Sequence, residues 1–176
     1  MLLRKINAGI SLLCVFMLLF HAVFNAVWML SGCTIPQIAN KMPWVLTGVM
    51  SAHAILSIVL AILGHKGAEK RKFPSYSKMN KATIIQRIGG ILLLPFTALH
   101  ILGTIGVTQP PQVVHAILPP LFFAIALIHA IISTSKAFVT LGIGNSTFVK
   151  VTDVAIKVIC GVTLIADLIG FYLYVC

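Results

Sequence analysis

Five long apolar stretches limit this chain to one class of fold. Each is about 20–25 residues long, which is enough to cross a hydrocarbon layer of roughly 30 Å as a helix. A backbone surrounded by lipid must satisfy its own hydrogen bonds, so each stretch is predicted to be helical. The sequence therefore predicts an all-α, polytopic membrane protein, a single membrane domain of residues 1–176 with five transmembrane helices in a bundle. The predicted helices cover residues 6–30, 43–63, 84–107, 119–141 and 151–175.

The composition excludes the other common classes of protein. Of the 176 residues, 59% are hydrophobic and only 9% are charged, whereas a soluble domain of this size needs far more charge on its surface. The excess of 13 Lys and Arg over 3 Asp and Glu falls mainly between the apolar stretches, where it indicates membrane topology and contact with lipid rather than with nucleic acid. The four cysteines have no metal-ligand spacing, so no iron–sulfur cluster or zinc site is expected within the chain.

The basic residues predict the orientation of the bundle. Arg4 and Lys5 precede the first stretch, and residues 64–81 form the most basic segment of the chain. By the positive-inside rule, the N-terminus and this segment are expected in the cytoplasm, and the chain is expected in the inner (plasma) membrane. Cys33 and Cys176 would then both lie outside, and the sequence leaves open whether they form a disulfide.

Four histidines lie within the predicted helices, one on each of the first four. Two of them, His53 and His129, follow by ten residues the proline that opens their stretch, and both are expected near the middle of the membrane. His21 and His100 are expected closer to its outer side, about 7 Å from the first two by the rise of a helix. These matching positions suggest that the first two helices and the next two are an internal repeat.

Histidines inside a membrane indicate a function, because burying an ionisable group in lipid is costly. Two imidazoles on facing helices are the axial ligands of bis-histidine haem, and the porphyrin fills the apolar space between them. The sequence thus predicts one or two b-type haems. The preferred ligand pairs are His53 with His129 and His21 with His100, while pairing between adjacent helices and a single haem stay open. His115 is expected in an outer loop.

Residues 83–90, with the sequence TIIQRIGG, continue through an apolar run to His100. This segment resembles the opening helix of the succinate dehydrogenase/fumarate reductase cytochrome b subunits. In that family a hydroxyl residue and an arginine four residues later border the quinone pocket beside the iron–sulfur subunit, which implies these roles for Thr83 and Arg87. Members with two haems have five helices and four helix-borne axial histidines, although their histidine-free helix is the third and here it is the fifth. The resemblance implies as ligands His21, His53, His100 and His129.

The expected function is that of a membrane anchor subunit with haem b, passing electrons between a membrane quinone and peripheral flavin and iron–sulfur subunits on the cytoplasmic face. Asp167, in the apolar part of the fifth stretch, is a further candidate for binding quinone. No catalytic residue of its own is expected, and flavin chemistry would belong to the partner because the chain has no glycine-rich dinucleotide motif. The alternative is a non-redox membrane subunit or small transporter whose histidines pack or relay protons. A structural assembly factor is a third interpretation.

Overall fold

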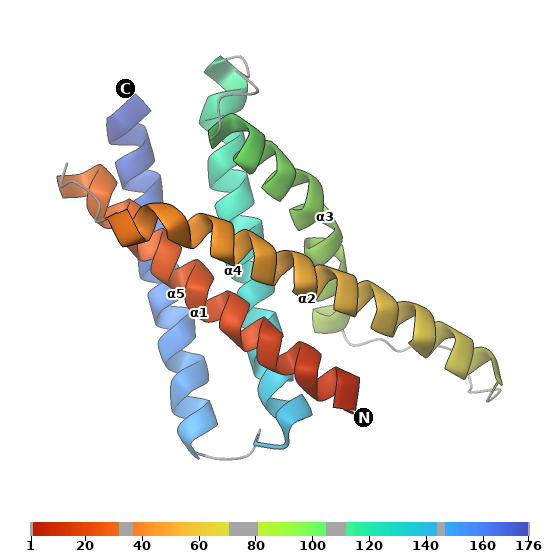
Figure 1. The fold of residues 1–176 in the computed structure, drawn as a ribbon. Coiled ribbons are helices and arrows are strands. Elements are labelled where there is room, and N and C mark those ends of the chain that lie inside the picture. Colours follow the sequence, from red (N-terminus) through yellow and green to blue (C-terminus); the bar gives the residue numbers. More distant parts are fainter. Residues whose placement is uncertain (1, 32–36, 71–80, 105–111, 144–146, 176) are drawn as a thin grey trace.

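The chain folds into five long helices in a computed structural model that describes residues 2–31, 37–70, 81–104, 112–143 and 147–175. This confirms the predicted all-α class, and no strand occurs within those ranges. Cys33, Cys176 and most of the basic segment lie outside the described residues or have undescribed side chains. The helices, shown in Figure 1, are α1 (Leu2–Ser31), α2 (Gln37–Lys70), α3 (Lys81–Thr104), α4 (Gln112–Leu141) and α5 (Thr147–Val175).

The first four helices are long and apolar enough to cross a membrane. Their spans are Leu2–Trp28, Lys41–Leu63, Thr83–Gly103 and Ile117–Leu141, as judged by length and composition over the described residues. Many of their large apolar side chains are exposed on the protein surface. Lipid is the solvent that suits such a surface, because water would make it unstable.

All five helices begin earlier than the sequence predicts, and two of them do so by six or seven residues. We expected Pro43 and Pro119 in the first turn of their helices, but α2 begins at Gln37 and α4 at Gln112, so both prolines lie in helix interiors. A proline removes only one backbone donor, and a helix in an apolar environment continues past it because the remaining backbone groups need partners. His115 consequently lies within α4 and not in a loop. Residues 105–107, predicted to end the third helix, are outside the described residues.

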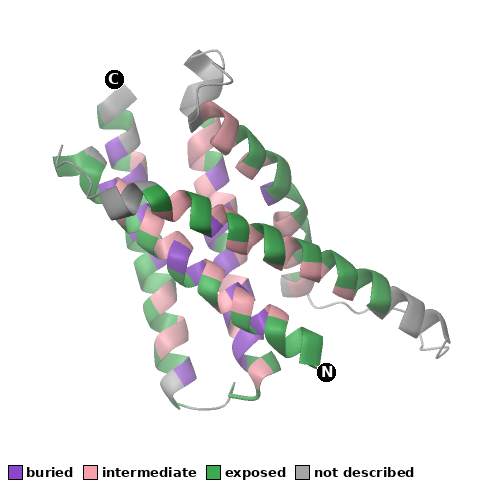
Figure 2. Ribbon diagram, viewed as in Figure 1, coloured by how far each residue is buried: buried purple, intermediate pink, exposed green. Residues whose placement is uncertain are grey.

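Helices α1 and α4 form the centre of the bundle. Helix α1 packs against α2, α4 and α5, whereas α4 packs against α1, α3 and α5. Helices α2 and α3 have extensive contacts with one neighbour each, α1 and α4 respectively. In Figure 1 the α1–α2 pair runs obliquely across α4 and α5. Buried residues accordingly follow α1 and α4, and exposed residues dominate α2 and α3 (Figure 2).

Small side chains bring the central helices together. Without a hydrophobic driving force between helices in lipid, close packing depends on small residues that let backbones approach. The buried faces of both helices are rich in alanine, serine and threonine. On α1 these are Ala8, Ser11, Ala22 and Ala26, and on α4 they are Ala126, Ala130, Ser133, Thr134 and Ala137.

Candidate haem site

His129 is held in a defined orientation at the interface of α3 and α4. Its Nδ1 lies 3.0 Å from the backbone carbonyl oxygen of Gln86. Because a carbonyl only accepts, Nδ1 carries the proton and donates it, and the lone pair of the neutral ring is on Nε2. In histidines that bind metal, a hydrogen bond from the ring nitrogen that does not bind the metal fixes the tautomer and the orientation of the ring.

Two glycines of α3 lie directly against the His129 ring. A Cβ atom added at Gly90 would be 3.1 Å from Cε1 of His129, and one added at Gly89 would be 3.5 Å from its Nδ1. Only a residue without a side chain leaves room at Gly90 for the ring in this position. The glycine pair of the TIIQRIGG segment therefore accommodates a candidate ligand.

A polar network extends from this histidine towards one end of α4. The side-chain amide of Gln86 donates to the Oγ of Ser133 at 3.0 Å and accepts from the Nζ of Lys136 at 2.7 Å. The same Nζ donates to the Oγ1 of Thr83 at 2.8 Å. Sequence reasoning missed Gln86 and Lys136. Their spacing could have indicated them. Gln86 lies three residues after Thr83, and Lys136 lies three residues after Ser133. Residues three or four apart lie on one face of a helix.

His53 is the predicted partner of His129. His53 and His129 lie within range of a direct electrostatic interaction, and His53 also interacts with the backbone of Asn7 on α1. The side-chain amide of Asn7 donates to Ser57 at 3.2 Å, which ties α1 to α2 at this point. The Nδ1 atom of His53 is buried and has no hydrogen-bond partner among the described residues, so this ring has an unused polar atom.

His21 and His100 are the other predicted pair. His21 and His100 interact electrostatically, and His100 stacks on Phe122 with ring centroids 5.2 Å apart and a tilt of 23°. Phe123 meets the same imidazole edge-on at 6.4 Å. The Nδ2 of Asn25 lies 3.2 Å from the Nε2 of His21 and donates to it. Iron bound through this Nε2 would replace the hydrogen bond from Asn25.

The two histidine pairs are separated by more than we expected. On α4, His129 follows Phe122 by seven residues, and on α3, His100 follows Gly90 by ten. At the rise of an α-helix these intervals correspond to about 10 and 15 Å, compared with the 7 Å expected from the predicted helix ends. The two histidine pairs therefore lie at different depths along α3 and α4.

The quinone candidates are divided between two parts of the bundle. Thr83 contacts Lys136, and the exposed Arg87 is within electrostatic range of the same lysine. Asp167 lies elsewhere: it is fourteen residues beyond Asp153 on α5, about 21 Å along the helix. Asp153 itself accepts a hydrogen bond of 2.5 Å from Ser135, the neighbour of Lys136. Asp167 is thus not brought to Thr83 and Arg87.

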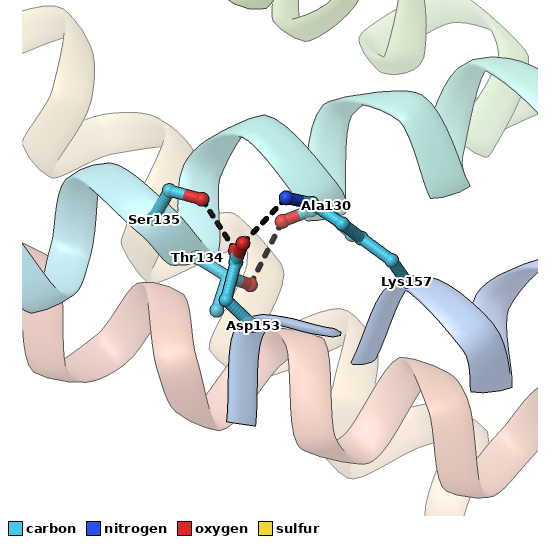
Figure 3. Close-up of polar contacts among 5 residues, drawn as sticks. All are labelled: Ala130, Thr134, Ser135, Asp153 and Lys157. Atoms are coloured by element: carbon cyan, nitrogen blue, oxygen red, sulfur yellow. Dashed lines mark hydrogen bonds and ion pairs between the residues drawn. The ribbon is translucent and has the colours of Figure 1, made fainter. Parts of the chain in front are cut away.

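Asp153 connects α4 with α5 at this end of the bundle. Figure 3 shows Ser135 and Lys157 both directed at its carboxylate, while Thr134 bonds the carbonyl of Ala130 one turn back, at 2.8 Å. Asp167, by contrast, is 1% exposed, and neither of its oxygens has a hydrogen-bond partner among the described residues.

No protein-family model, curated protein or solved structure matches this chain. Across the ranges that the structure describes, no three or more His, Cys, Asp or Glu side chains gather as a metal site. Haem iron needs only two protein ligands, and the four histidines form two pairs. The fixed tautomer of His129, the adjacent glycines and the unused atom of His53 fit a bis-histidine haem. The class defined so far is an all-helical protein with four helices suited to a membrane.

Proposed function

We propose that this chain is a haem b-containing membrane anchor subunit that passes electrons between a membrane quinone and a peripheral flavin and iron–sulfur dehydrogenase or reductase of the succinate/fumarate type. One observation carries the proposal. His129 donates its Nδ1 proton to the Gln86 carbonyl, presents Nε2 as a ligand, and lies beside two glycines within electrostatic range of His53.

The residues of the chain bind and orient two haems. His53 and His129 would hold one, and His21 and His100 would hold the other. The haem, when bound, supplies reversible one-electron transfer at its iron. The Gln86 carbonyl keeps the His129 ring in position, and the apolar helices exclude water from both macrocycles.

At the Gln86 end of the bundle, Thr83 and Arg87 border the quinone. Thr83 supplies a hydroxyl, and Arg87 supplies a charged donor at the helix end. The support for this placement is the resemblance of the α3 segment, together with the polar network that joins Thr83 to Lys136. Asp167 has a separate role, because it is in the other half of α5.

The topology that goes with this function has five spans. Helix α5 has 29 residues, enough to cross a bilayer, and packs against both central helices. With the N-terminus in the cytoplasm, Thr83, Arg87 and the basic segment face the same compartment. The peripheral subunits dock there, in the inner (plasma) membrane of the cell.

The alternative function is that of a non-redox subunit or small transporter in which the histidines pack or relay protons. Asp167 favours it, because a buried carboxyl with two unpartnered oxygens is typical of intramembrane proton or ion pathways. The two functions predict different visible spectra for the purified protein, because a haem protein is coloured and a protein without a cofactor is colourless.

The test is a reduced-minus-oxidised visible spectrum of the detergent-purified chain, with pyridine haemochrome quantification. We expect two haems per chain, and one in the single variants His53→Ala and His129→Ala. The double variant His53→Ala/His129→Ala should also retain one haem, whereas His100→Ala/His129→Ala should retain none. If adjacent helices held each haem, the haem contents of the two double variants would be exchanged, with none in the first and one in the second. A colourless protein, purified from haem-supplied cells with its partner subunits, would refute the redox function.

A further inference from the structure

Lys136 is the lysine of α4 that interacts electrostatically with the candidate haem ligand His129. Lys136 lies seven residues after His129 on α4, two helical turns and about 10 Å along the axis. We propose that Lys136 controls the reduction potential of the haem held by His53 and His129, keeping it above that of the haem held by His21 and His100. This inference rests on the proposed function.

The lysine is held in place by α3. Its Nζ donates to Thr83 at 2.8 Å and to the side-chain oxygen of Gln86 at 2.7 Å. Gln86 is at the same time the residue whose carbonyl orients His129. The distance between the lysine charge and the histidine is therefore set by one residue that bonds both.

The surrounding charges reinforce the effect of the lysine. Arg87 adds a second positive charge within electrostatic range of Lys136. The nearest carboxylate on α5, Asp153, is paired with Lys157 and bonded by Ser135. This pair is neutral overall. The field at His129 from these groups is consequently positive.

The cations on the helices of the second histidine pair are farther from the histidines. On α3, Arg87 precedes His100 by thirteen residues, about 20 Å along the helix. On α1, Lys5 precedes His21 by sixteen residues, about 24 Å along the helix. His100 is instead packed against Phe122 and Phe123. A positive charge stabilises the ferrous state, which carries one positive charge fewer than the ferric state. The haem of His129 therefore has the higher potential and accepts the electron first.

Coulomb's law gives the size of the effect. With an effective dielectric constant of about 20 and a separation of about 10 Å, one charge changes the ferrous-to-ferric equilibrium on the order of tenfold. For a one-electron couple, a tenfold change corresponds to about 59 mV.

The experiment is a potentiometric titration of the full chain with both haems, followed by visible spectroscopy. Lys136→Gln removes the charge, and we expect the midpoint potential of one haem to fall by about 59 mV while the haem-to-protein ratio stays the same. Gln86→Glu, which places a negative charge beside the lysine, should lower the same potential. Lys136→Arg keeps the positive charge, so the midpoint potential of this haem should stay close to the wild-type value. The double variant Asp153→Asn/Lys157→Gln is the matched control, because it removes a lysine together with the carboxylate that is paired with it, leaves the net charge unchanged and should leave both potentials unchanged.

The outcomes separate this inference from the proposed function. A wild-type chain without haem would overturn both. Two haems with unchanged potentials in Lys136→Gln and in Gln86→Glu would overturn the role of Lys136 alone. If Lys136→Gln does not fold, the Gln86→Glu variant decides. A fall in the potential of the haem that is absent from His129→Ala, with no fall in the other, would support the inference.

Discussion

The contact between Gly90 and His129 predicts that adding one methyl group to α3 disturbs haem binding. In Gly90→Ala the new Cβ would lie 3.1 Å from Cε1 of the imidazole, whereas carbon atoms pack at about 3.5–4.0 Å. The ring must therefore move by roughly half an ångström, or the helices must separate by that amount. The Nδ1 of the same ring is bonded at 3.0 Å to the carbonyl of Gln86, one turn earlier on α3, so either movement strains a contact that orients the ligand.

Two effects of opposite sign decide the stability of this variant. Alanine is favoured over glycine in a helix by about 1 kcal/mol, and overpacking costs about 1–3 kcal/mol. Gly103→Ala is the matched control on the same helix, because nothing lies within 4 Å of its added Cβ. We expect Gly103→Ala to be stabilised by up to about 1 kcal/mol and Gly90→Ala to be less stable than it by about 1–3 kcal/mol. Gly89→Ala, at an ordinary contact distance of 3.5 Å, should fall between them.

The assays are the haem-to-protein ratio and the free energy of unfolding in mixed detergent micelles. Gly90→Ala should lose the haem of His129 in part or completely, and Gly103→Ala should retain both haems. If the Gly90 and Gly103 variants have the same haem content and the same stability, the close contact with the imidazole does not constrain the ligand. The reasoning from the glycine pair would then be refuted.

Three further predictions follow from individual contacts. Ser135→Ala should lower the free energy of unfolding by about 1.5–3 kcal/mol, because it removes a hydrogen bond to the charged group of Asp153. Lys157→Ala should lower it by less than about 1 kcal/mol, because its pair with Asp153 is partly exposed. Equal losses in chemical unfolding would contradict this reasoning. Asp167→Asn should be at least as stable as the wild type, since neither oxygen has a partner in the described part of the chain, and a loss above about 1 kcal/mol would show that the carboxyl binds something. In a cysteine-free background, Lys5→Cys should react with a membrane-impermeant maleimide in inverted membrane vesicles and not in intact cells, and labelling of intact cells would reverse the proposed orientation.

The sequence by itself determined the secondary structure of this protein and the apolar character of its helices. Each predicted apolar stretch overlaps one of the five helices, because helix formation in lipid depends on local composition and on the need to pair every backbone group. The helix starts were less accurate. Pro43 was expected to open its helix, although the helix begins at Gln37. A local rule on proline cannot show how far a helix continues beyond it.

The tertiary structure alone decided which helices are neighbours and which polar groups meet. In lipid both the buried and the exposed faces of a helix are apolar, so hydrophobic periodicity does not distinguish them, and the central position of α1 and α4 follows from the packing of small residues. The sequence singled out His129 as a candidate ligand. Its hydrogen bond to Gln86, its contact with Gly90 and the hydrogen bonds of Lys136 to α3 became visible only in the folded chain, as did the distance of Asp167 from the quinone candidates. These relations join residues on different helices, and their geometry depends on how the helices cross rather than on any local segment.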